Sequence, residues 1–99
     1  MNMQQMIIQA QKMQREMQKK QAALEAEEFT ISKGGAVTVV VMGDKSIKSV
    51  SIDKDALDPE NKEMIEEMIV MAVNEAIEQI KAREEEISAS VSGGMGGLF

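Results

Sequence analysis

Apolar residues near the start of the chain recur in steps of three and four. The positions are Met3, Met6, Ala10, Met13, Met17 and Leu24. This spacing is typical of the packing seam of an amphipathic helix. Neither Pro nor Gly interrupts the segment, and Gln, Lys, Met, Ala and Glu are good helix formers. We therefore predict a long helix over residues 3–27.

From Phe29 the apolar period changes to two, which indicates strands. The predicted strands are 29–31, 36–42 and 47–52, with turns at 32–35 and 43–45. The strand at 36–42 has the strongest signal because it is rich in β-branched residues. Short turns between consecutive strands predict an antiparallel three-stranded meander.

A second long helix is predicted to start with Asp58 as its N-cap and Pro59 as its first residue. Its apolar residues cover roughly 200° or more of the helix surface, which is wider than one core face requires. A second copy of the chain would provide the other cover, so we predict an α+β homodimer. The residues expected at its interface are Met68, Ile69, Ala72, Val73, Ala76 and Ile77. Residues 1–88 would then form one α-β-β-β-α domain, and residues 89–99 a flexible glycine-rich tail.

The charge of the chain is polarised along its length, although the net charge is −6. Residues 1–24 sum to +3, residues 25–58 to −3 and residues 59–99 to −6. No stretch has the roughly 18 consecutive apolar residues of a membrane span, and the first residues do not resemble a signal peptide. There is no cysteine for a disulfide framework. We therefore expect a cytoplasmic protein with no membrane partner.

Catalysis has little support in the composition. The chain contains no His and no Cys, so the usual general base, thiol nucleophile and soft metal ligands are missing. Asp53, Asp55 and Asp58 are spaced somewhat like a calcium loop, but the required Gly and closing Glu are absent. A strand end followed by a helix cap explains them more simply. We predict no enzyme activity, no cofactor, no metal and no small-molecule substrate.

A cationic ridge on the first helix is the functional candidate. Lys12, Arg15 and Lys19 cluster about 160° from the apolar seam and have only Glu16 as an acidic neighbour. Such a ridge can contact DNA phosphates, although it can equally be a solvated helix face. No aromatic residues accompany it, so base stacking on single strands is not expected. The weaker candidates are Lys20, Lys45 and Lys48, with Lys81 and Arg83 added if a dimer brings the helices together.

The order of helix, meander, helix and glycine-rich end resembles the YbaB/EbfC family of bacterial nucleoid-associated proteins. The residues that carry the resemblance are Gln9–Gln14, Val39–Gly43, Val50–Asp53, Ala72–Ala76 and Gly93–Phe99. The resemblance implies a cytoplasmic, nucleoid-associated homodimer that binds duplex DNA with little sequence preference and without a cofactor. Where relatives often carry adjacent basic residues in the third strand, this chain has Lys48 followed by Ser49.

Two other functions remain open from the sequence. A protein-binding adaptor or holdase chaperone would use the Met-rich helical surface, and the basic ridge would then serve only solubility. Met at helical spacing is also a plain core or dimer residue. The third reading is an inert subunit of a larger assembly.

Overall fold

The computed structural model describes residues 2–95, and their side chains as far as Ser90, and it confirms the predicted α+β order. The helices are α1 (Met3–Glu25) and α2 (Lys62–Met95). Between them lie β1 (Glu28–Lys33), β2 (Val37–Met42) and β3 (Ile47–Ile52). Two short 3-10 turns, Lys54–Ala56 and Pro59–Asn61, lead into α2.

The three strands form one antiparallel sheet in the order β1-β2-β3, as the short turns predicted. The first turn lies at residues 34–36, because Ser32 and Lys33 extend β1 beyond the predicted strand. Gly34 and Gly35 have φ values of 56° and 66°, a left-handed conformation that glycine adopts at little cost. Both strand edges of the sheet, on β1 and β3, are unpaired within residues 2–95.

The core lies between one face of the sheet and α2. Alternate residues of β2 point into it, and Val37, Val39 and Val41 are almost completely buried. On α2, Ala72, Ala76 and Ile80 have no exposed surface and follow the spacing of one helical stripe. The helix packs on β1 and β2, and it leaves β3 largely uncovered.

The C-terminal end of α1 is held against the β2–β3 turn. Leu24 is the one buried side chain of this helix, and the amide of Gly43 donates a hydrogen bond of 2.9 Å to the carbonyl of Glu27. A Cβ atom built on Gly43 would lie 1.7 Å from the backbone oxygen of Leu24. Glycine is therefore required here by the close approach of two backbones.

The second helix differs from the prediction at both ends. The Asp58 side chain accepts a hydrogen bond from the amide of Glu60, as a cap should, but it caps a 3-10 turn, and α2 itself begins at Lys62. At the other end α2 continues to Met95, whereas the sequence placed the start of a flexible tail at residue 89. Residues 96–99, which belong to the predicted tail, lie outside the described part of the chain.

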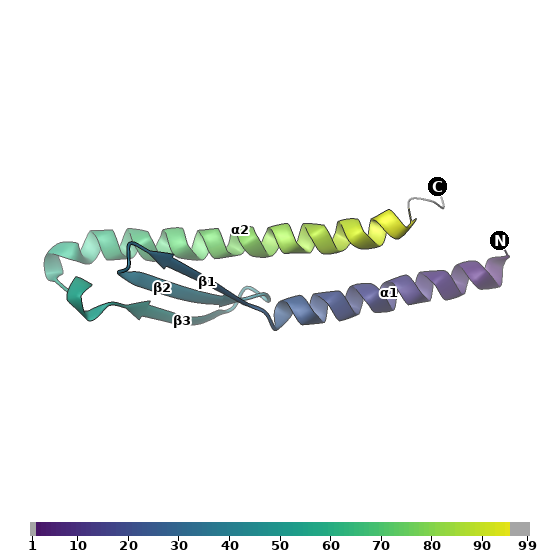
Figure 1. The fold of residues 1–99 in the computed structure, drawn as a ribbon, viewed down its shortest axis with the longest axis horizontal. Helices are drawn as coiled ribbons and strands as arrows, with labels where there is room; N and C mark the ends of the chain where they lie inside the picture. The colour runs from purple at the N-terminus through teal and green to yellow at the C-terminus, as the bar shows by residue number, and fades with distance from the viewer. Residues whose placement is uncertain (1, 96–99) are drawn as a thin grey trace.

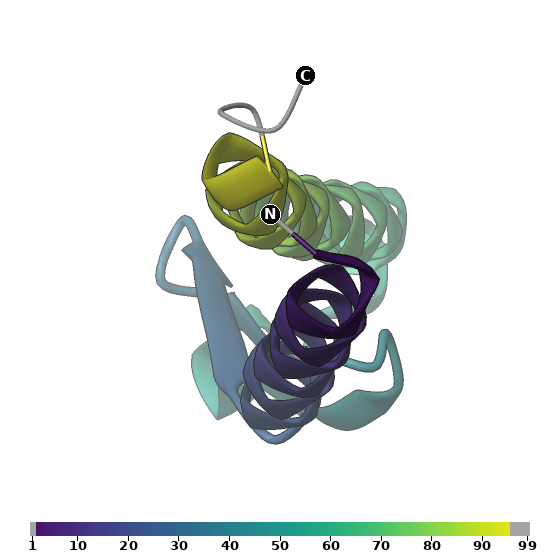
Figure 2. The same cartoon turned by 90° about the vertical axis from the view of Figure 1, so that its right-hand side faces the viewer.

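The molecule is elongated, with extents of 69 × 20 × 14 Å. In Figure 1, α2 runs along most of the molecule, with the sheet beside its first half and α1 beside its second half, and the first turns of α1 extend beyond the end of α2. Figure 2 views the end at which α1 begins and α2 ends. We call α1 the arm, and the sheet with residues 62–80 of α2 the body.

Candidate nucleic-acid interface

The predicted cationic ridge lies on the exposed side of the arm. Lys12, Arg15 and Lys19 are all exposed, and none of them forms an ion pair within residues 2–95. The side chains that face α2, Met13, Met17 and Leu24, are half-buried or buried and lie on the other side of the helix. The ridge spans about 10 Å along the helix axis, at 1.5 Å per residue.

The cations of the sheet are in a different electrostatic situation. Lys33 pairs with Glu75, Lys48 pairs with Glu28, and the Nζ atom of Lys45 lies 3.2 Å from Glu84 Oε1. A neighbouring carboxylate opposes the attraction that the cation would exert on a phosphate. Lys45 and Lys48 were candidates for DNA contact, and the structure places both beside acids.

The two candidates on α2 also differ from each other. Arg83 donates to Glu27 Oε1 at 2.8 Å and lies 3.6 Å from Glu86 Oε2, so its guanidinium is occupied. Lys81 is exposed and has no ion pair among the described residues. The geometry therefore ranks Lys81 above Arg83 as a free cation.

Lys20 has a partner that the sequence did not suggest. Its Nζ atom donates a hydrogen bond of 2.9 Å to Ser90 Oγ, and that hydroxyl donates to the carbonyl of Ile87. The contact joins the arm to the last turns of α2. The prediction missed Ser90 because residues 89–99 were read as a tail, although Ile80, Ile87 and Val91 continue the helical apolar spacing.

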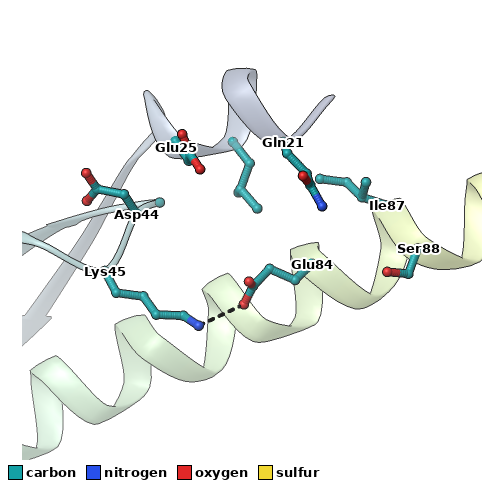
Figure 3. Close-up of a pocket in the computed structure, with 9 residues that line it drawn as sticks. Gln21, Glu25, Asp44, Lys45, Glu84, Ile87 and Ser88 are labelled. Carbon is teal, nitrogen blue, oxygen red and sulfur yellow. Dashed lines mark ion pairs between the residues drawn. The ribbon is translucent and has the colours of Figure 1, made fainter. Parts of the chain in front are cut away.

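The cleft shown in Figure 3 lies where the arm meets the β2–β3 turn and α2. It has a volume of about 360 Å³, and its lining includes three acidic residues, Glu25, Asp44 and Glu84, with Lys45 as the one base among the lining residues. Hydrogen bonds from the Ser46 hydroxyl and amide lower the pKa of Asp44, which keeps it charged. Such a cleft repels phosphate, so an anion-binding surface on the arm would not extend to the C-terminal end of α1.

The residues expected at a dimer interface fall into three groups. Ala72 and Ala76 are fully buried in the core of the chain itself, so they have no surface to offer a partner. Met68 lies on the β1 side of α2, where its Cε atom would be 3.0 Å from a Cβ on Gly34. Ile69, Val73 and Ile77 are half-buried on the opposite flank of α2, the flank from which Glu84 reaches the β2–β3 turn.

Next to that flank, the core face of the sheet is open at β3. Val50 pairs with the buried Val39 and points to the same side of the sheet, yet it is 44% exposed. Ile47 and, on α2, Val70 are also exposed, at 54% and 58%. The alternation of the strand puts Val50 and Ile52 on one face, but the sequence could not show that α2 would leave this face uncovered.

The aspartates that are spaced like a calcium loop act as caps. Asp53 accepts from the amide of Asp55 and Asp58 accepts from the amide of Glu60, as the simpler interpretation predicted. Within residues 2–95 there is no group of three or more His, Cys, Asp or Glu side chains arranged to hold a metal ion. No helix in the described chain is both long and apolar enough to cross a membrane.

These features define a small α+β protein whose candidate contact with nucleic acid is a projecting basic helix. The chain belongs to the YbaB/EbfC DNA-binding family, which it matches over residues 1–95. It is 45% identical to a nucleoid-associated protein of Alkaliphilus metalliredigens over 99% of this chain and 89% of the relative. It is 43% identical to the nucleoid-associated protein NT01CX_0824 of Clostridium novyi, over 99% of this chain and 84% of the relative.

Proposed function

We propose that this protein is a nucleoid-associated homodimer that binds duplex DNA through its backbone, largely independently of sequence. The carrying observation is a contrast between two sets of cations. Lys12, Arg15 and Lys19 are exposed and have no ion pair within the described residues, whereas the sheet cations are paired with acids. The DNA-binding family and the names of the relatives support DNA as the partner. Lysine and arginine on phosphates supply affinity without reading bases.

The open core face at β3 supports the homodimer. Ile47, Val50 and Val70 form an exposed apolar surface beside the half-buried Ile69, Val73 and Ile77. A second copy related by a twofold axis would cover this surface and present two arms to one DNA duplex. The wide apolar band of α2 is then covered by the sheet on one side and by the partner on the other.

A duplex-DNA titration over a salt series tests the DNA proposal. Lys12→Gln, Arg15→Gln and Lys19→Gln should each reduce the magnitude of the log-affinity versus log-salt slope by about one, equally on unrelated sequences. Lys45→Gln and Lys48→Gln are matched controls, because their charges are already neutralised by Glu84 and Glu28, and the slope should hardly change. All five variants should melt within a few degrees of the parent, because exposed charges contribute little to folding. A triple ridge variant that binds as well as the parent would contradict the proposal, as would a parent that does not bind at low salt.

Sedimentation equilibrium of Val50→Asp tests the homodimer. The carboxylate would be buried without a partner at the proposed interface, so dimerisation should weaken at least about a hundredfold. The fold should survive, because Val50 is half-exposed in the single chain. Ser49→Asp is the matched control, since the neighbouring residue of β3 points to the other face of the sheet. A parent protein that sediments as a folded monomer at micromolar concentration would rule out the dimer.

The adaptor or holdase function retains one supporting observation, the exposed Met3 and Met6 at the start of the arm. An apolar dye separates the two functions. A holdase should bind the dye strongly at rest, whereas a dimer that has buried its β3 surface should not.

A further inference from the structure

One large apolar residue lies on the same side of the arm as the cationic ridge. Ile8 precedes Lys12, Arg15 and Lys19 by 4, 7 and 11 residues, a spacing that places all four on one face of the helix. Its side chain is 59% exposed. The apolar seam is centred on a different side of the helix, and Ile8 is not among the residues that form the core or pack against it.

Among the side chains that the structure describes, as far as Ser90, none buries Ile8. The residues that share its shallow groove are Gln5, Gln9, Lys12, Met13 and Glu16 of α1 and Ser90 of α2. Most of these residues are polar, so they offer the Ile8 side chain little apolar surface to pack against. The open apolar surface proposed for the dimer is at β3, in the other half of the molecule (Figure 1).

The surroundings of Ile8 favour a polyanion as its partner. Three cations without an ion pair among the described residues follow it within about three turns, and the first turn of α1 contains no acid to oppose the positive end of the helix dipole. An exposed apolar side chain on the same helix face as a row of cations matches the way in which proteins insert a wedge between base pairs. Isoleucine and methionine serve as such wedges, and the step that they open bends the duplex.

We propose that Ile8 inserts between stacked bases and that the arm thereby bends the DNA that it binds. The proposal rests on the proposed function, because the ridge must first hold the phosphates. Lys12 and Arg15, one and two turns further along, would hold the backbone beside the opened step. Insertion of this kind recognises deformability instead of base identity, so it agrees with weak sequence preference.

The test compares Ile8→Ala with Ile7→Ala. Ile7 is the matched control, because it is the same residue type, 52% exposed, and about 100° round the helix from Ile8, away from the ridge. The bend is measured by energy transfer between dyes at the two ends of a duplex of about 30 base pairs, at saturating protein. The parent and Ile7→Ala should bend the duplex by roughly 20–90°, and Ile8→Ala should leave it nearly straight.

Affinity separates this inference from the proposed function. Ile8→Ala should bind up to about tenfold more weakly with an unchanged salt slope, because no phosphate contact is lost. A parent that binds without bending the duplex, or an Ile8→Ala variant that bends it as the parent does, would overturn the wedge alone. A parent that fails to bind at low salt would overturn both proposals.

A second readout uses the DNA. Pyrimidine–purine steps such as TA unstack easily, whereas A-tracts are stiff. The parent and Ile7→Ala should therefore prefer a duplex with central TA steps over an A-tract duplex by about threefold to tenfold, and Ile8→Ala should lose that preference. Equal affinity of the parent for the two duplexes would count against insertion.

Discussion

The arm and the body use their apolar residues and their charges in opposite ways. In the body, Val39 and Ile80 have no exposed surface, and the sheet cations Lys33, Lys45 and Lys48 all face acids. In the arm, Leu24 is the one buried side chain, and the ridge cations have no acidic partner within the described residues. The residues of the body thus contribute mainly to stability, whereas the exposed cations of the arm can contact a partner. Substitutions in the two regions should therefore affect different measurements.

The largest effect is expected from a matched pair of isoleucines. Ile80→Ala should cost about 2–5 kcal/mol of unfolding free energy, because it leaves a cavity under a fully buried side chain. Ile8→Ala should change the unfolding free energy by less than about 0.5 kcal/mol, because the position is exposed. Urea denaturation of both variants measures the difference. Equal losses would mean that the arm is as tightly packed as the body.

The junction between the two regions should give an intermediate effect. Gly43→Ala places a methyl group against the backbone of Leu24, which cannot rotate away, so we expect a loss of about 1–3 kcal/mol. Hydrogen exchange should increase first at residues 20–27, where the arm is attached. Gly35→Ala is the control: it is strained by a φ of 66° but meets no atom within 4 Å. It should destabilise the turn without loosening the arm.

The smallest effect concerns Asp44, on the turn that contacts the arm. Hydrogen bonds from Ser46 lower its folded-state pKa below the ordinary value of 3.8. Its stabilising contribution is therefore fully present above pH 3.8 and is lost as the pH falls through the lower, folded-state pKa. Asp44→Asn should reduce the melting temperature slightly at neutral pH, and the difference from the parent should shrink under strongly acidic conditions. A difference that grows as the pH falls would contradict this sign.

The elements of this fold were predictable because each has a clear hydrophobic period. The end of α2 was not, because its last residues include Ser and Gly, which are poor helix formers, and the Lys20–Ser90 contact supports it from the arm. The dimer prediction met the same difficulty. The width of the apolar band of α2 indicated that two surfaces pack against this helix. It could not show that Ala72 and Ala76 would be buried in the core of the chain itself and not at the dimer interface.

The candidate site was predictable in part. The ridge follows from local helical spacing, so Lys12, Arg15 and Lys19 could be placed on one face without knowing the fold. The pairing of Lys45 with Glu84 joins residues far apart in the chain, and only the tertiary structure reveals it. The same holds for Ser90, whose role depends on how the two helices meet.

The protein has a net charge of −6, and its elongated shape separates the ridge from many of its acids. The ionic strength therefore determines whether these acids repel DNA that is bound at the ridge. Lys12 lies about twelve residues, or roughly 18 Å, along the arm from Leu24, near which Glu25, Glu27 and Glu84 gather. At physiological ionic strength the Debye length is about 8 Å, so a phosphate beside Lys12 experiences the ridge and hardly any of those carboxylates. Near 0.01 M salt the Debye length approaches 30 Å, and the same carboxylates repel the DNA. The affinity for DNA should therefore rise as salt is diluted and then level off at low salt. Lys12 should be the ridge cation least affected by the repulsion, because it is the farthest from those carboxylates.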